Sequence, residues 1–184
     1  MAETLKGLSV AFLAVDGFEQ AELLEPRKAV QAAGARAVVV SAKTGKIQGF
    51  EHTDKGEQVA VDLTFAEADP AHFAAVVLPG GVVNADDIRT HPKAREFVKR
   101  MQDAGKPVAV ICHGPWLLIS ADLVRGRTLT SWPSLQDDLR NAGAKWEDKE
   151  VVVDKNWISS RKPDDIPAFN KALLKQLEEA AKAA

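Results

Sequence analysis

The sequence contains a single cysteine, Cys112, among its 184 residues. One cysteine cannot close an internal disulfide, so the fold must be stabilised by its hydrophobic core, and this suits a reducing compartment. A hydrophobic content of 46% over this length is sufficient for one domain with a sizeable core. We therefore expect a single domain over residues 1–184 and a cytoplasmic location.

The chain also lacks an excess of either charge. Its 24 Lys and Arg residues nearly balance 26 Asp and Glu residues, for a formal net charge of −2. Electrostatics therefore do not favour nucleic acid or an anionic membrane as a partner. The first apolar run, in "MAETLKGLSVAFLAVDGF", is about eight residues long before Asp16, too short for a membrane span. No cleavage-type site follows it, so we interpret it as a buried first strand.

No internal repeat, low-complexity segment or linker is found. Continuous apolar runs alternate with helical periodicity, which predicts an α/β fold with a mostly parallel sheet covered on both faces. Buried strands are expected within residues 8–15, 35–42, 73–81 and 106–114, and helices within residues 19–34, 91–105, 115–124 and 163–184. Two further segments differ: the alternating residues 56–65 predict an antiparallel excursion, and residues 150–160 a late strand or hairpin. The closing "EEAAKAA" is expected to fray.

Cys112 lies in "VAVICHGPWLLI", where a predicted strand turns sharply into a predicted helix near Pro115. Ligands of open α/β sheets bind beyond the carboxyl ends of the strands. A thiol at a helix N-terminus faces unpaired N–H groups and the positive end of the helix dipole, which lower its pKa. The alternative is a small buried hydrophobic residue. The location favours a nucleophile, and we expect a lowered thiol pKa.

His113 follows the cysteine directly, and no histidine occurs after it. A cysteine nucleophile needs a nearby base, so His113 is the best candidate in the chain, although adjacent residues at a turn need not touch. The alternative is a histidine that only orders the turn. The other histidines, His52, His72 and His91, lie in apparent loops and are expected to be structural or surface residues. No metal-ligand spacing links them, and we expect no metal and no other cofactor.

Two more loops should reach the same edge of the sheet. In "DGFEQAE", Glu19 lies near a helix start, where a carboxylate is favourable for that reason alone, and Glu22 is an equal competitor. In "LPGG", Gly80 and Gly81 would let backbone N–H groups approach a ligand and form an oxyanion hole. The alternative for the glycine pair is an ordinary turn.

Three segments, "LPGG", "ICHGPWLLISADLVRGRTLTSWPSLQDDLRNAGA" and "EVVVDKNWISSRKPDDIPAFN", resemble the ThiJ/PfpI family, and its PfpI branch most closely. The resemblance covers nearly the whole chain and implies a flavodoxin-like three-layer sandwich. It implies that Cys112 is the nucleophile, that His113 is its partner and that Glu19 is the loop glutamate. An ionised Glu19 would repel a thiolate, so the pair requires a protonated Glu19 that donates to sulfur.

In the PfpI branch an acidic residue of a neighbouring subunit orients the histidine. The matching stretch here is "NADDIR", which points to Asp86, with Asp87 as a close alternative. The resemblance therefore implies a homo-dimer or higher oligomer with a shared site. It also implies a cysteine hydrolase acting on peptides or on glycated protein adducts, with a role in stress response. The alternatives are a redox sensor in which Cys112 oxidation is the functional event, and a structural oligomer.

Overall fold

The computed structural model describes residues 4–184 and has a seven-stranded central sheet in the order β11-β12-β8-β7-β1-β3-β6. All strand pairs are parallel except β11–β12. The strands are β1 (Ser9–Leu13), β3 (Arg36–Ser41), β6 (Leu63–Thr64), β7 (Ala75–Leu78), β8 (Val108–Ile111), β11 (Val152–Asp154) and β12 (Trp157–Ser160). The predicted α/β flavodoxin-like sandwich is confirmed.

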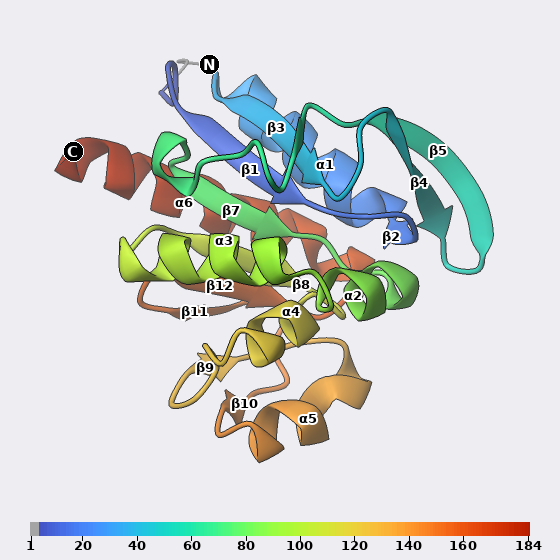
Figure 1. The fold of residues 1–184 in the computed structure, drawn as a ribbon. Coiled ribbons are helices and arrows are strands. Elements are labelled where there is room, and N and C mark those ends of the chain that lie inside the picture. The colour runs from blue at the N-terminus through green and yellow to red at the C-terminus, as the bar shows by residue number, and fades with distance from the viewer. Residues whose placement is uncertain (1–3) are drawn as a thin grey trace.

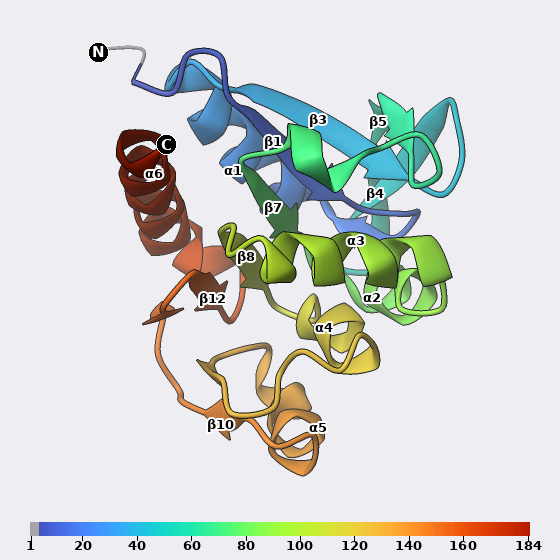
Figure 2. The ribbon, with the colours of Figure 1, turned by 60° about the vertical axis from the view of Figure 1, so that its left-hand side comes forward.

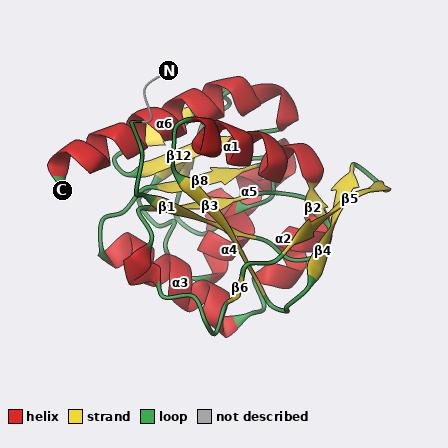
Figure 3. Cartoon of the chain, turned by 90° about the horizontal axis from the view of Figure 1, so that it is seen from above, coloured by secondary structure: helices red, strands yellow, loops and turns green. Residues whose placement is uncertain are grey.

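Helices cover both faces of this sheet. Figure 3 shows α1 and α6 on one side and α3, α4 and α2 on the other. The helices are α1 (Gln20–Ala32), α2 (Val82–Ile88), α3 (Pro92–Asp103), α4 (Pro115–Ser120), α5 (Gln136–Asn141) and α6 (Ile166–Ala183). Short 3-10 turns occur at Pro70–His72, Pro133–Leu135 and Pro163–Asp165.

The two faces of the sheet have separate hydrophobic cores because neighbouring strand residues point in opposite directions. Val76 of β7 packs with Phe97 of α3 and Leu117 of α4 in one cluster. Val77 packs with Leu23 of α1 and Phe169 of α6 in the other. The central strands are buried on both faces, which explains why they read as continuous apolar runs in the sequence.

The strand order reverses at β1, which pairs with β3 on one side and with β7 on the other. Such a reversal leaves a crevice at the carboxyl ends of the strands. The loops that follow β1, β7 and β8 all lie at this edge of the sheet (Figure 1). The central sheet therefore brings together the three loops that carry the predicted site residues.

A second, three-stranded sheet stands beside this edge. It consists of β2 (Phe18–Glu19), β4 (Lys46–Glu51) and β5 (Asp54–Ala60), with β4 and β5 paired antiparallel. The hairpin β4–β5 extends away from the main sheet in Figures 1 and 2. The predicted antiparallel excursion is therefore present, with β6 returning to the main sheet after it.

Some elements differ from the sequence-based expectation. Helix α6 runs to Ala183 and so includes the residues that were expected to fray. The predicted late hairpin is present as β11 and β12. The short strands β9 (Thr128–Leu129) and β10 (Lys145–Trp146) and the helices α2 and α5 were not predicted. Within residues 4–184, no helix combines the length and the apolar character that crossing a membrane would need.

Candidate active site

Cys112 occupies a strained turn between β8 and α4. Its φ angle is 62°, in the left-handed region that non-glycine residues rarely adopt. Both sides of its backbone are held: the N–H donates to the Ser160 carbonyl at 3.0 Å, and the carbonyl accepts from Trp132 N–H at 2.9 Å. The side chain is 6% exposed. A strained conformation held on both sides presents the thiol at the sheet edge, as in the nucleophile turns of hydrolases.

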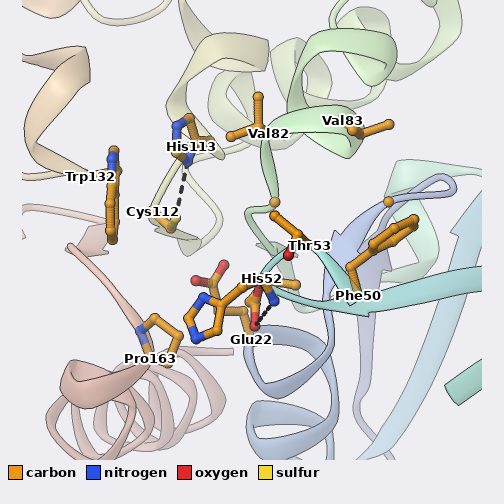
Figure 4. A pocket seen from close by; sticks show the side chains of 13 residues that line it. Glu22, Phe50, His52, Thr53, Val82, Val83, Cys112, His113, Trp132 and Pro163 are labelled. Carbon is orange, nitrogen blue, oxygen red and sulfur yellow. Dashed lines mark hydrogen bonds between the residues drawn. The ribbon is translucent and has the colours of Figure 1, made fainter. Parts of the chain in front are cut away.

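The adjacent His113 does touch the thiol, which the sequence could not establish. Its Nδ1 lies 3.2 Å from Cys112 Sγ, and Figure 4 marks this contact with a dashed line. The imidazole lies between two indoles. It stacks on Trp132, with 5.7 Å between the ring centroids, and it packs edge-to-face with Trp116, with 5.4 Å between the centroids. Burial lowers the pKa of His113. A neutral imidazole with an unprotonated Nδ1 can accept the proton of the thiol.

The carboxyl group beside the thiol belongs to Glu22, and this corrects the assignment to Glu19. Glu22 is fully buried on the inner face of α1, in line with Leu23, Pro26 and Val30. Its Oε2 accepts the N–H of Gly80 at 2.7 Å, and the carboxyl group interacts with the Cys112 thiol. Its buried Oε1 has no hydrogen-bond partner within residues 4–184.

Glu19 is directed elsewhere because its backbone is extended rather than helical, with φ −69° and ψ 119°. It ends β2 and pairs with Phe50 of the hairpin. Its carboxylate accepts the backbone N–H of His52, at 3.1 Å to Oε2. Glu19 therefore lines the same cavity without being the partner of the thiol.

Burial governs the protonation of both groups. It raises the pKa of Glu22 from 4.5 to about 8, so this carboxyl group is protonated at neutral pH. Burial also raises the pKa of the Cys112 thiol, and a negative charge on Glu22 would raise it further. The N–H groups of Gly81 and His113 act in the opposite direction. Desolvation therefore opposes the lowered thiol pKa expected from the helix N-terminus, and it favours the neutral thiol.

The glycine pair after β7, Gly80 and Gly81, contacts the site residues through its backbone N–H groups. The N–H of Gly80 is already used by Glu22, so the prediction that it faces a ligand is wrong. The N–H of Gly81 does face Cys112, together with that of His113. Asn84, which was not predicted, fixes this loop: its side chain donates to the carbonyls of Pro79 and Gly80 and accepts from Val15 N–H at 2.8 Å.

The thiol, His113, Glu22 and Gly81 line a cavity of about 460 Å³. Figure 4 shows the side chains that surround it. The apolar members are Phe50, Val82, Val83, Trp132 and Pro163, and the polar ones are Glu19, Glu22, His52, Thr53, Cys112 and His113. The hairpin β4–β5 supplies one wall, which the sequence analysis missed because the hairpin is distant in sequence from every predicted site residue.

Other predicted residues lie outside this cavity. Asp86 is exposed on α2 and borders a separate groove with Arg89 and Trp116. His91 pairs with Asp87 at 3.5 Å. His72 borders a cavity that contains Ser9 at the start of β1, away from the carboxyl ends of the strands. Of the three histidines expected to be structural, His52 alone lines the candidate active site.

Comparison of the sequence with known proteins points to one family. The DJ-1/PfpI family model matches residues 8–176. Deglycase TK1284 of Thermococcus kodakarensis is 46% identical over 170 residues, which are 92% of this chain and 99% of that protein. Deglycase PfpI of Pyrococcus furiosus is 43% identical over 171 residues, 93% of this chain and 100% of that protein.

The fold agrees with solved structures. A two-domain protein from Anabaena variabilis, with a DJ-1/ThiJ/PfpI-like and a ferritin-like domain, superimposes with a TM-score of 0.88 at 36% identity. The match covers 92% of this chain and 48% of that protein, so this chain spans about half of its length. The sequence and the fold together show that the chain belongs to the DJ-1/PfpI family.

Proposed function

We propose that this protein is a cysteine-dependent hydrolase that acts on glycated protein adducts of methylglyoxal or glyoxal, with peptide bonds as a second substrate class. The observation that carries the proposal is the 3.2 Å contact between Cys112 Sγ and the Nδ1 of a buried His113. Relatives that match nearly their full length are named deglycases, which supports adducts as the first choice.

The chemistry follows from the protonation states. Sγ of Cys112 attacks the substrate carbonyl carbon while the thiol proton passes to Nδ1 of His113. The carbonyl π electrons move to the oxygen, where the N–H groups of Gly81 and His113 are placed to receive the negative charge. With a peptide, His113 then returns the proton to the amine leaving group, and water hydrolyses the thioester that remains. In an adduct, the carbon that bears the protein nitrogen or sulfur is a carbinol, so its C–H proton must first move to the neighbouring carbonyl carbon through an enediol, with His113 as the base. The 2-hydroxyacyl amide or thioester formed in this way then undergoes the same attack by Sγ, which releases the protein group, and water releases the 2-hydroxy acid.

A neutral Glu22 has a separate part in this scheme. Because it is protonated at neutral pH, it adds no negative charge beside the developing tetrahedral centre. Its proton can also form a hydrogen bond to sulfur during attack. An ionised Glu22 would oppose any negative charge on sulfur, so the proposal predicts loss of activity as Glu22 ionises above pH about 8.

Assembly is part of the same proposal. Nε2 of His113 has no hydrogen-bond partner among residues 4–184, and Asp86 is exposed and outside the cavity of its own chain. Asp86 of a second copy would orient the imidazole. Val82 and Val83, 53% and 59% exposed at the cavity rim, are apolar residues that such a copy would cover. We place this oligomer in the cytoplasm, in stress response.

A redox sensor is the second candidate. Cys112 is the single thiol of the chain, and the N–H groups of Gly81 and His113 beside it would stabilise an oxidised, anionic sulfur. The hydrolase proposal is favoured because a sensor needs no base, whereas His113 is in contact with the thiol.

The deciding experiment compares the fully reduced wild type with Cys112→Ser on methylglyoxal adducts and on a peptide panel. Turnover that depends on Cys112 on either panel supports the hydrolase. No turnover on both panels, together with selective peroxide oxidation of Cys112, supports the sensor. Turnover that survives in Cys112→Ser would place the chemistry elsewhere.

A further inference from the structure

Glu19 lies at the cavity in a fixed position. Strand β2 pairs with β4, which places Glu19 opposite Phe50. The two carboxylate oxygens face the N–H of His52, at 3.1 Å for Oε2 and 3.5 Å for Oε1. His52 itself has a left-handed backbone with φ 58°, which turns this N–H toward the carboxylate. The hairpin therefore holds a carboxylate at the wall of the active-site cavity.

This carboxylate has no opposing charge within the cavity. No Lys or Arg is among the described residues that line it. At neutral pH Glu22 is protonated and burial favours the neutral form of His113. The field of Glu19 reaches the bottom of the cavity, because Glu19 contributes to the raised pKa of Glu22. Apolar side chains line part of the cavity around Glu19, so its field is screened less there than on an open surface.

We propose that Glu19 is a specificity-determining residue that selects substrates with a cationic group close to the carbon attacked by Cys112. This inference rests on the proposed hydrolase function and narrows its substrate class. A guanidinium or ammonium group entering the cavity finds one fixed carboxylate and an apolar wall that accepts its hydrocarbon stem. An anionic substrate meets Glu19 as a like charge.

The test uses two short peptides with the same methylglyoxal adduct on cysteine. The neighbouring residue is trimethyllysine in one, whose quaternary ammonium cannot itself be glycated, and its neutral tert-butyl isostere in the other. Wild type should prefer the cation by about fivefold in kcat/KM, the scale of a partly exposed charge pair. Glu19→Gln should bring the ratio close to one. Glu51→Gln removes an equal charge from strand β4, which pairs with the strand of Glu19, but outside the cavity, and it should keep the ratio.

Equal kcat/KM values for the two peptides in wild type, or a ratio that survives in Glu19→Gln, would overturn the inference while the hydrolase function stands. Absence of Cys112-dependent turnover on both peptides would instead contradict the function. In that case binding decides: the same peptides without the adduct are titrated into Cys112→Ser and followed by the NMR signal of the Trp132 indole. A higher affinity for the cation that Glu19→Gln abolishes supports the inference, and equal affinities reject it.

Discussion

Gly80 and Glu22 are joined by a 2.7 Å hydrogen bond from the glycine N–H to carboxyl Oε2. This bond connects the loop after β7 to the inner face of α1, directly beneath the Cys112 thiol. It leaves Gly81 N–H as the donor of this loop that faces the sulfur. The position of the oxyanion donor and the position of the buried carboxyl group therefore depend on each other.

Glu22→Gln should change how stability depends on pH. The folded protein keeps a proton on Glu22 between pH 4.5 and about 8, whereas the unfolded chain releases it. The associated stability is complete below that window and is lost as pH rises through it. The free energy of unfolding of wild type should therefore fall relative to Glu22→Gln, on the order of 4 kcal/mol at most. Urea unfolding at pH 5 and pH 8 measures the difference.

The matched control is Glu25→Gln, which removes an exposed carboxylate from the same helix and should leave the pH dependence of wild type intact. Parallel stability curves for wild type and Glu22→Gln would show that Glu22 has an ordinary pKa in the folded protein.

The pKa of the Cys112 thiol should also depend on the side chain at position 22. Glu22→Gln removes the negative charge that raises the pKa of Cys112 and still offers a donor to sulfur, so it should lower the thiol pKa relative to wild type. Glu22→Leu also removes the charge but cannot donate, and its thiol pKa should lie above that of the Gln variant. Alkylation rates by iodoacetamide as a function of pH measure all three. A shift of this kind in Glu19→Gln instead would return the role to Glu19.

Trp132→Ala should move the acidic limb of the kcat/KM profile to higher pH. The indole stacks on His113 and is 38% exposed, so removing it lets water reach the imidazole, whose pKa is lowered by burial. We expect kcat/KM to fall about tenfold as well, because the base loses its orientation. Trp132→Phe retains a stacking ring and serves as the control. An unchanged acidic limb in Trp132→Ala would mean that another residue titrates there.

If the proposed shared site forms, Asp86→Ala should lower turnover about tenfold without dissociating the oligomer, because it would remove the carboxylate proposed to orient His113 from a second copy. Asp87→Ala is the neighbouring control, since Asp87 already pairs with His91 within the chain. Light scattering and activity are followed together on dilution. A fully active monomer would contradict both the shared site and the role of Asp86.

The α/β sandwich could be predicted because its central strands are buried on both faces and appear as unbroken apolar runs. The position of Cys112 followed from the strand-to-helix change at Pro115. Helical periodicity also places Glu22 on the inner face of α1, together with Leu23 and Pro26. A carboxylate in that apolar stripe is the signal that distinguishes it from Glu19.

The remaining site residues could not be found from local patterns. The distance between Cys112 and His113 depends on the left-handed backbone at Cys112, and no apolar period encodes that angle. The β4–β5 wall depends on contacts between segments that are far apart, such as Gly17 N–H to the Gln48 carbonyl. The protonation of Cys112 depends on its depth in the folded chain, which the helix-dipole argument omits.

Gly80 has one further consequence, which concerns tolerance to substitution. A Cβ at this position would overlap Glu22 Oε2 and come within 2.6 Å of the Cys112 Cβ, so even alanine does not fit. At Gly81 the backbone angle is an additional obstacle, with φ 88°. Volume alone therefore excludes a side chain at position 80, and its absence leaves room for the Glu22 carboxyl group beside Cys112. In a saturation library selected for activity, Gly80 should therefore be as invariant as Cys112.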